Sequence, residues 1–383
     1  MSFLDPAYDV CENATVRYRV EVAHNESALD ELENDWNRLN TATQEPNPFM
    51  TVGWYRSWLG GSNHQPLGNR LSPYVLVLKE GNSVAGIVPF VRHIASRLFR
   101  VRKLEFGSIH ADYNDLVLGN DLEGQTTAVV DFLARTSEQW DVVDLRDLRD
   151  TGVQIAVIER ALAHAGLSYH VLPEQNSCPY MKIDGDASEM TQRLSGHGRR
   201  ALRNRCKRAA AQGLRTRIIE NPAQEPDLLK KLIRLESNKH LRSIYPPFIG
   251  MFPDVFQSLI ESLGPQGWLY VALLESGDQP VAFQLGFRCG DKLWDYSKAY
   301  DRLFSGFAPG TLLLLALLDY GFERGFREYD FLRGEEPYKL VWSTGSHRRL
   351  RVLIWNKHKI SRVRKFIYFN LRSAFHRFLR RPA

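Results

Sequence analysis

Cysteine is scarce in this chain of 383 residues. The four cysteines, Cys11, Cys178, Cys206 and Cys289, lie far apart and form no C-x-x-C pair. Disulfide frameworks and structural zinc sites usually show such paired spacing, so we expect neither, and we expect a reducing compartment.

Targeting and membrane-spanning segments are also lacking. The N-terminus has no basic region followed by an apolar one, as a signal peptide would. The longest purely apolar run, Leu312 to Leu318, is too short to cross a bilayer. We therefore expect a cytoplasmic protein.

Several catalytic signatures are missing. No Gly-x-Ser-x-Gly sequence occurs, which disfavours a serine hydrolase. The histidines show neither H-x-x-x-H nor H-E-x-x-H spacing, so no metal site is predicted.

Acidic residues are absent from two stretches. Residues 193–217 and residues 357–383 each contain nine Lys or Arg and no Asp or Glu. Subtracting the nine charges of the second stretch from the total of +6 leaves −3 for the rest of the chain. The basic character is therefore local. The first stretch has no interleaved aromatics, so DNA is not an expected partner.

What the chain does contain is one pattern used twice. Two β-rich runs joined by a short glycine-containing turn occur at 73–91 and again at 268–287, and each predicts a hairpin. Further on, Trp140–Arg146 resembles Glu328–Arg333, and each follows a helical stretch. Similarity at a spacing of roughly 190 residues predicts a duplicated α/β domain with mixed sheets.

These repeats give the expected domain organisation. It comprises an N-terminal extension (1–14), a first domain (15–185), a second domain (186–356) and a basic amphipathic tail (357–383). The segment Asp184–Ser188 marks the boundary between the two domains, with Ser188 or Asp186 as the N-cap of the next helix.

The loop before the last long helix is a candidate anion site. A strand at 292–300 leads into Ser305–Gly310, and a helix is predicted from Thr311. Free backbone N–H groups at a helix N-terminus bind anions, and glycine lets a phosphate approach closely. The alternative is an ordinary loop with Pro309 near the first helical position.

Polar residues follow the next predicted strand, 328–332. Asp330, Arg333, Glu335, Glu336, Tyr338 and Lys339 lie on or just after its end. In acyl transfer a carboxylate serves as base, Tyr338 as acid, and Lys339 holds an anionic acceptor or the carbonyl charge. Alternatively, Glu335 and Glu336 begin a short helix and complement its dipole.

Four segments carry a resemblance to a known family. They are Asp112–Leu118, Gly198–Arg205, Pro309–Leu315 and Tyr329–Trp342. With them, the chain resembles the GNAT acyltransferase superfamily and, within it, the CelD/BcsL-type proteins of polysaccharide synthesis, which are similar to Fem-type peptidyltransferases. The resemblance implies tandem duplicated GNAT-like domains.

The resemblance also implies a function. It points to an acyltransferase that moves an acetyl or other acyl group from a coenzyme A thioester to an amino sugar or cell-surface glycan precursor. The implied donor residues are Ser305, Gly306, Pro309, Gly310 and Thr311. The implied catalytic residues are Asp330, Glu335, Glu336, Tyr338 and Lys339. The implied acceptor residues are Asp112, Asp115, Arg199, Arg203 and Arg333.

Two alternatives stay open. The loop from Arg302 to Gly310 departs from the usual GNAT pattern Gln/Arg-x-x-Gly-x-Gly/Ala. An aminoacyl-tRNA-dependent transferase of Fem type is therefore one alternative, and a non-catalytic scaffold in polysaccharide synthesis is the other. The basic run 193–217 is either a solvated linker helix or a grip for phosphates or a polyanionic glycan.

The tail carries a separate expectation. Apolar and aromatic residues alternate there with the nine basic residues at near-helical spacing. A basic amphipathic helix of this kind fits the surface of an anionic membrane, which would place the protein at the inner face. The alternative is a helix that docks on the protein's own surface.

Overall fold

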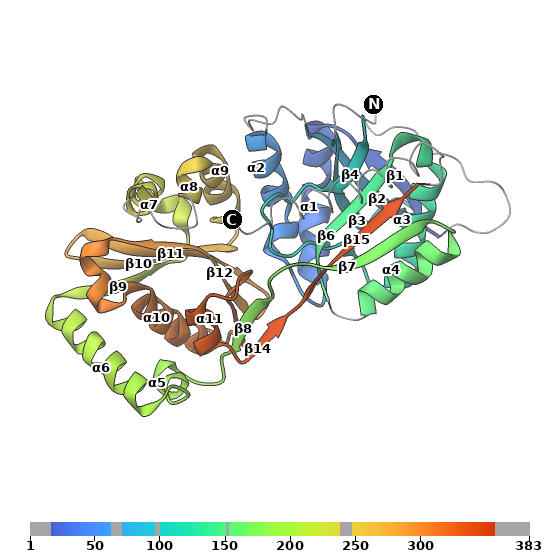
Figure 1. Cartoon of the computed structure of the whole chain (residues 1–383). Helices are drawn as coiled ribbons and strands as arrows, with labels where there is room; N and C mark the ends of the chain where they lie inside the picture. The colour runs from blue at the N-terminus through green and yellow to red at the C-terminus, as the bar shows by residue number, and fades with distance from the viewer. Residues whose placement is uncertain (1–16, 63–70, 96–99, 151–152, 238–246, 357–383) are drawn as a thin grey trace, which may run out of the picture. The chain divides into compact units, whose positions relative to one another are not determined.

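The computed structural model describes residues 17–62, 71–95, 100–150, 153–237 and 247–356. These residues form two compact units, each built on its own sheet (Figure 1). Unit 1 takes its described residues from Met1–Gln44, Phe49–Glu174 and Arg349–Ala383, and unit 2 consists of Glu45–Pro48 and the described residues of Gln175–Arg348.

The helices and strands of unit 1 are as follows: β1 (Arg19–Ala23), α1 (Glu26–Ala42), α2 (Val52–Ser62), β2 (Ser72–Glu80), β3 (Ser83–Ile94), β4 (Arg102–Phe106), β5 (Val117–Leu118), α3 (Leu122–Arg135), β6 (Val142–Arg149), α4 (Val153–His164), β7 (Ser168–Pro173) and β15 (Arg349–Trp355). The sheet order is β1-β2-β3-β4-β6-β15-β7, and β5 pairs with β3.

Unit 2 contains these elements: β8 (Cys178–Lys182), α5 (Ala187–Thr191), α6 (Gly196–Ala211), β9 (Leu214–Ile219), α7 (Leu228–Ser237), α8 (Phe248–Met251), α9 (Pro253–Leu263), β10 (Leu269–Ser276), β11 (Gln279–Cys289), β12 (Lys292–Tyr300), the 3₁₀ helix η4 (Arg302–Phe307), α10 (Pro309–Glu323), β13 (Glu328–Asp330), α11 (Pro337–Trp342) and β14 (Gly345–His347). The order of its sheet is β14-β8-β13-β12-β11-β10-β9.

Each unit repeats the same succession of elements, which confirms the predicted α/β fold of duplicated GNAT-like domains. An antiparallel hairpin (β2–β3 or β10–β11) is followed by a strand (β4 or β12), a helix (α3 or α10) and a strand parallel to the one before the helix (β6 or β13). Both predicted hairpins are present, and Gly81 and Gly277 supply the positive φ that their turns require.

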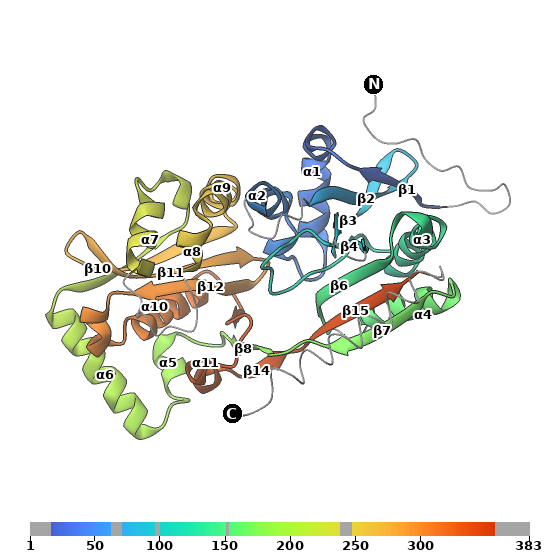
Figure 2. The same cartoon turned by 45° about the horizontal axis from the view of Figure 1, so that its top comes forward.

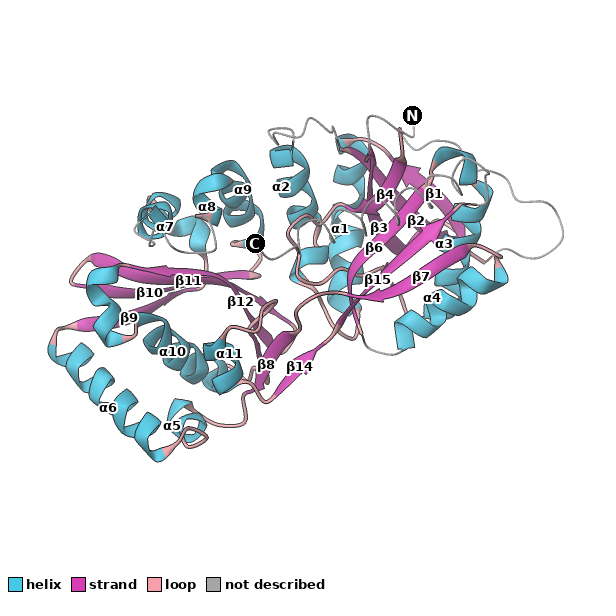
Figure 3. Ribbon diagram, viewed as in Figure 1, coloured by secondary structure: helices cyan, strands magenta, loops and turns pink. Residues whose placement is uncertain are grey.

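The two halves of the chain exchange one strand each (Figure 3). In unit 1, β15 from the end of the chain lies between β6 and β7. In unit 2, β8 from the end of the first half lies between β13 and β14. This differs from the predicted domains, which assigned residues 179–183 to the first half and 348–356 to the second.

Helices cover the two faces of the unit 2 sheet. Leucines of α10 pack with Tyr270, Leu293 and Tyr329 in one apolar core. Figures 1 and 2 agree that α7, α8 and α9 lie on the opposite face from α10. Since side chains alternate along a strand, Glu328 and Asp330 of β13 point away from α10, on the other side from Tyr329.

Local chemistry explains most element boundaries. Asp186 caps α5 in a capping box with Glu189, as one of the two predicted N-caps. Ser195 caps a separate helix, α6, so two helices follow the predicted domain boundary. The short α11 has Glu336 as its N-cap and Pro337 at its first position, in agreement with the alternative interpretation that Glu335 and Glu336 begin a short helix.

Candidate active site

The site begins where β12 and β13 separate. They pair in parallel at only three positions, Lys292 with Glu328, Leu293 with Tyr329 and Trp294 with Asp330. Beyond Trp294, β12 continues to Tyr300 while paired only with β11. We call the point where β12 and β13 separate the fork. Beyond the fork the edge of β12 is open, so an extended ligand could form backbone hydrogen bonds with it as a further β-strand would.

A cavity of about 700 Å³ lies at this fork and lies entirely within unit 2. That volume is in the usual range for small-molecule sites. Its lining comes from β11, β12, η4, the start of α10, and the segment after β13: Phe283, Lys298, Ala299, Tyr300, Arg302, Ser305, Ala308, Pro309, Gly310, Thr311, Leu313, Leu314, Phe331, Tyr338 and Trp342. Of the predicted donor residues, only Gly306 does not line the cavity.

One end of the cavity is suited to an anion. The helix α10 has Ala308 as its N-cap and no side chain that caps its first turn. Pro309 occupies the first helical position, two residues before the predicted start at Thr311, and a Cβ added at Gly310 would meet nothing within 4 Å. Pro309 has no N–H and the N–H of Thr311 donates to the carbonyl of Ala308 at 2.9 Å, so the N–H of Gly310 and the positive end of the helix dipole are what this terminus offers a ligand. Arg302 adds a formal positive charge to the lining.

Ala308 itself adopts left-handed backbone angles, φ 54° and ψ 61°. A residue with a side chain pays about 1 kcal/mol or more for this conformation. Such strain is common at ligand sites, where it sets the direction of the chain. Here it turns η4 into the N-terminus of α10.

Lys298, which lines the cavity, belongs to an ion pair that sequence reasoning missed. The ammonium of Lys298 lies 2.5 Å from a carboxylate oxygen of Asp295 and 4.2 Å from the ring centroid of Tyr338. The Asp295 side chain is 2% exposed. Charged residues inside an otherwise buried strand were the available signal, because isolated charges are rarely buried without a partner.

Three buried polar side chains lie on the strands of this sheet, on β10, β11 and β13. Tyr270, Gln284 and Tyr329 are fully buried, and the amide of Gln284 donates a hydrogen bond to the Tyr329 hydroxyl. Burial raises the pKa of both phenols well above the usual value, and the carboxylate of Asp295 raises each further. Both phenols therefore stay protonated near neutral pH.

Close packing fixes the strand next to this cluster. At the β-bulge of β11, a Cβ on Gly286 would lie 2.2 Å from the carbonyl oxygen of Trp294 and 2.5 Å from the hydroxyl of Tyr270. Only glycine fits there. The bulge thereby holds β12 in place beside the fork.

The predicted catalytic residues separate into two groups. Tyr338 lines the cavity, whereas Lys339 is buried away from it. The ammonium of Lys339 donates to the carbonyl of Arg333 at 2.7 Å and pairs with Glu336 at 3.0 Å, so it ties the loop to α11.

The carboxylates of Glu335 and Asp330 also have hydrogen-bond partners within unit 2. Glu335 accepts hydrogen bonds from the N–H and hydroxyl of Ser177, which lower its pKa. Asp330 is fully buried and accepts from the N–H of Leu332 at 2.7 Å. Arg333 is exposed. The catalytic roles of these residues stay predictions.

The predicted acceptor residues of the first half belong to unit 1. Asp112 is buried. Asp115 accepts from the N–H of Leu116 at 2.6 Å and from the amide of Gln154. Burial raises the pKa of Asp115 to about 6, although both hydrogen bonds oppose the rise.

Arg199 and Arg203 lie on α6, where both are exposed. The helix packs on the core of unit 2 through Leu202, Cys206 and Ala209. Near its end, Arg208 donates to the carbonyl of Gly306 at 3.1 Å. The helix therefore lies against η4, beside the anion end of the cavity.

This geometry can be set beside known proteins. Residues 196–340 match the family model of the acetyltransferase (GNAT) domain. The match spans α6 to α11 and thus the fork and the cavity. It confirms the prediction that the protein is an acyltransferase, and it names neither the donor nor the acceptor.

Solved structures show the same fold over most of the chain. FemX is 12% identical, with a TM-score of 0.59, over 82% of this chain and 95% of its own. A conserved protein of unknown function from Bacteroides thetaiotaomicron is 11% identical, with a TM-score of 0.54, over 88% and 100%. L-PGS from Bacillus licheniformis is 12% identical, with a TM-score of 0.51, over 91% and 96%. At these identities the likeness concerns the fold alone.

No curated protein sequence matches the chain. Within the part of the chain that the structure describes, no helix is both long and apolar enough to cross a membrane.

Proposed function

We propose that unit 2 transfers an acyl group from a coenzyme A thioester to an amino or hydroxyl group of an amino sugar or cell-surface glycan precursor. The observation that carries the proposal is the cavity at the fork. It joins an uncapped helix N-terminus with an open strand edge and an apolar interior. A thioester donor needs these three features for its pyrophosphate, its pantetheine arm and its acyl group.

The chemistry requires few groups. The acceptor nucleophile attacks the thioester carbonyl, a C–N or C–O bond forms, the C–S bond breaks, and the thiolate takes up a proton. Tyr338 faces the cavity and is the proposed acid. Lys298, held by Asp295, is placed to donate to the carbonyl oxygen as its charge develops. The proposed base is one of the carboxylates Asp330, Glu335 and Glu336.

The glycan acceptor is proposed from the resemblance to CelD/BcsL-type proteins. In this proposal Arg199, Arg203 and Arg333, which are exposed in unit 2, bind the acceptor. The proposed place of action is the cytoplasmic side of the membrane, which residues 357–383 would reach.

A glycine substitution tests the donor site. Gly310→Asp should abolish binding of acetyl-CoA in isothermal titration, because a carboxylate in the first turn of α10 repels phosphate. The fold should survive, since the site has room for a side chain and an acid suits a helix N-terminus.

Gly196→Asp is the matched control. Gly196 begins α6, also has no atom within 4 Å of an added Cβ, and lies outside the cavity lining. Unchanged acetyl-CoA affinity in Gly310→Asp would refute the donor site. Equal loss in both variants would show a general charge effect instead.

A second donor class, aminoacyl-tRNA, is favoured by one observation. The helix α6 carries six Lys or Arg and no acid, and it lies against η4. Nucleic-acid backbones bind clusters of basic residues of this kind, and the binding weakens steeply as the salt concentration rises. Charge reversal at Arg200 and Arg203 should abolish salt-dependent binding of tRNA if this donor is used. It should leave acetyl-CoA binding unchanged if the thioester is used.

A further inference from the structure

Large hydrophobic side chains are exposed mainly around the cavity of unit 2. Among the residues that the structure describes, eight such side chains are exposed. Three of them, Val153, Met251 and Phe322, each lie on a different helix, away from the others. Single exposed hydrophobics of this kind are common. The other five lie on the end of β12, on η4 and on α11, and we call them the apolar rim: Tyr300, Leu303, Tyr338, Leu340 and Val341.

The apolar rim adjoins the cavity on two sides. Tyr300 and Tyr338 line the cavity and are exposed, so they stand at its opening. Leu303 is 87% exposed and follows Arg302, which also lines the cavity. Exposed hydrophobic side chains that gather at one place on a protein mark an interaction site.

The short helix α11 turns its apolar residues outward. Lys339 and Trp342 are buried, whereas Leu340 and Val341 are exposed. At about 100° per residue, the two exposed residues lie on the face of the helix opposite to the two buried ones. Burial of Lys339 and Trp342 therefore fixes the direction in which Leu340 and Val341 point.

A basic helix lies beside the apolar rim. Six Lys or Arg and no acid occur on α6, and all six side chains are exposed. Arg208 donates to the carbonyl of Gly306 on η4 at 3.1 Å, and its guanidinium lies 5.9 Å from the ring centroid of Phe307. The helix thus brings positive charge to η4, where Leu303 lies. Figures 1 and 2 agree that α6 and α11 lie on the same face of the unit 2 sheet as α10.

The net charge of this face comes from α6. Residues 300–307 contain one acid and one base, and residues 333–342 contain two of each, so the segments that carry the apolar rim are neutral by formal count. The face therefore combines exposed apolar side chains with a separate row of cations.

We propose that the apolar rim and α6 together dock unit 2 on an anionic lipid bilayer, with the cavity opening toward the lipid surface. Exposed apolar side chains beside a basic helix fit this partner, because apolar groups enter the acyl boundary while cations meet the phosphates. Tyrosine suits the same depth, since its ring is apolar and its hydroxyl stays in water. The inference does not depend on the proposed function, and it concerns residues other than 357–383.

Two other occupants fit the face less well. A second copy that met the same face would bring the cations of one α6 against those of the other, because a two-fold interface uses one surface twice. A nucleic acid would bind α6, but Leu303, Leu340 and Val341 have no ring on which a base can stack. An anionic bilayer accommodates both the charges and the aliphatic side chains.

The docking face and residues 357–383 would act together. Stable attachment to a bilayer generally takes two signals, because one alone binds weakly and reversibly. The tail would supply one signal and the docking face the other, so the loss of either should release the chain from the membrane.

Flotation of the full chain with lipid vesicles, in the absence of substrate, tests the docking face. Wild-type protein should bind vesicles of phosphatidylcholine with phosphatidylglycerol better than vesicles of phosphatidylcholine alone, and salt should weaken the binding. The double variant Leu303→Gln/Leu340→Gln should lower the partition coefficient on anionic vesicles by more than about tenfold, because two apolar side chains no longer enter the bilayer. The double variant Arg200→Glu/Arg205→Glu should lower it as well, because cations of α6 are replaced by acids.

Met251→Gln is the matched control. Met251 is 53% exposed, close to the 54% of Leu340, but it lies on α8, on the opposite face of the unit 2 sheet from α10. Its substitution should change the partition coefficient by less than about twofold. Circular dichroism checks that each variant is folded.

Three results would overturn the proposal. The first is equal partition of wild type and Leu303→Gln/Leu340→Gln, or an equal loss in Met251→Gln. The second is equal binding of the wild type to vesicles with and without phosphatidylglycerol. The third is a wild-type dimer in sedimentation that Leu303→Gln/Leu340→Gln abolishes while vesicle binding is unchanged, which would assign the face to a second copy.

Discussion

The two units place a helix after the same strand, but they treat its N-terminus in opposite ways. In unit 1, Asp121 caps α3: it accepts from the N–H of Gly124 at 3.0 Å and pairs with Arg17 at 3.0 Å. In unit 2, α10 begins without a side-chain cap. A carboxylate thus occupies in unit 1 the place that a phosphate would need. Unit 1 thus has a side-chain cap at this position, and unit 2 leaves the position open for the proposed anion.

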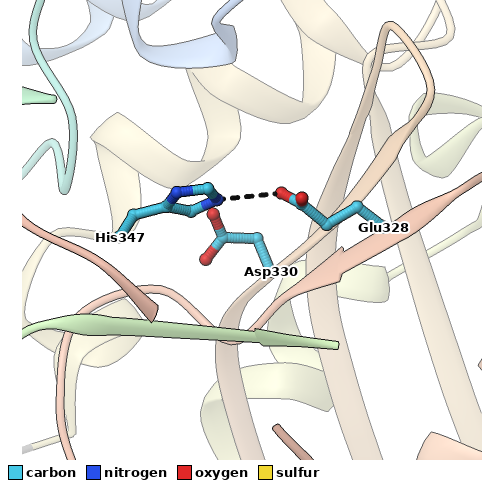
Figure 4. A group of neighbouring side chains, drawn as sticks. All are labelled: Glu328, Asp330 and His347. Atoms are coloured by element: carbon cyan, nitrogen blue, oxygen red, sulfur yellow. Dashed lines mark hydrogen bonds and ion pairs between the residues drawn. The ribbon is translucent and has the colours of Figure 1, made fainter. Parts of the chain in front are cut away.

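The residues at the point where the parallel strands separate also differ between the two units. Asp144 joins β4, β6 and β15 through three cations. Asp330 instead shares its neighbourhood with His347 and Glu328. In unit 1 three cations compensate one buried carboxylate, whereas in unit 2 an imidazole and a second carboxylate lie near the equivalent aspartate (Figure 4).

The largest effect should come from removing the exchanged strand. Deleting residues 348–383 removes β15, which pairs with β6 and β7 and contributes Val352 and Ile354 to the core of unit 1. We expect the protein to lose cooperative unfolding of unit 1, measured by urea titration with far-UV circular dichroism. A truncated chain as stable as the full one would show that β15 is dispensable.

Next in size is the effect of the buried aspartate of unit 1. Asp144→Asn should reduce the free energy of unfolding by about 3–5 kcal/mol, because it leaves buried cations without their carboxylate. The same substitution at the exposed Asp278 of unit 2 should change it by less than about 0.5 kcal/mol. Chemical denaturation of both variants measures the difference. Equal losses would contradict the structural role of Asp144.

A smaller effect should appear with pH. The pKa of Asp115 is about 6 in the folded protein, above its value in the unfolded chain. The folded state therefore holds the proton more tightly, and this group's contribution to stability falls as pH rises from about 4 to about 6. Relative to wild type, Asp115→Asn should gain stability over this range and stay level above it. Urea midpoints at several pH values test this, with the exposed Asp278→Asn as control.

Deleting residues 357–383, which lie outside the described residues, should have the smallest effect on the stability of the rest of the chain. The remaining chain has a formal charge of −3 and should not be drawn to an anionic surface. Flotation with anionic liposomes should be lost on truncation and should weaken with salt in the full chain. Equal flotation of both forms would reject the membrane proposal. Loss of solubility would show that the tail covers the protein's own core.

Local sequence patterns predicted much of the fold. Alternating apolar residues and a glycine at each turn located both hairpins. The repeated order of elements predicted the duplication, and Pro309 with Gly310 located the uncapped end of α10. These features depend on backbone preferences within a few residues of one another, so a single segment of sequence contains the information.

Other features were decided only by the tertiary structure. Nothing local in Cys178–Lys182 or Arg349–Trp355 says which sheet each strand enters, because a strand pairs with whichever edge presents a matching apolar face. Lys298 lines the cavity because β12 extends beyond its pairing with β13. His347 contacts Glu328 because β14 and β13 both pair with the exchanged strand β8. Contacts between residues far apart in sequence exist only after the chain has closed its long loops, and that closure is set by the packing of the whole unit.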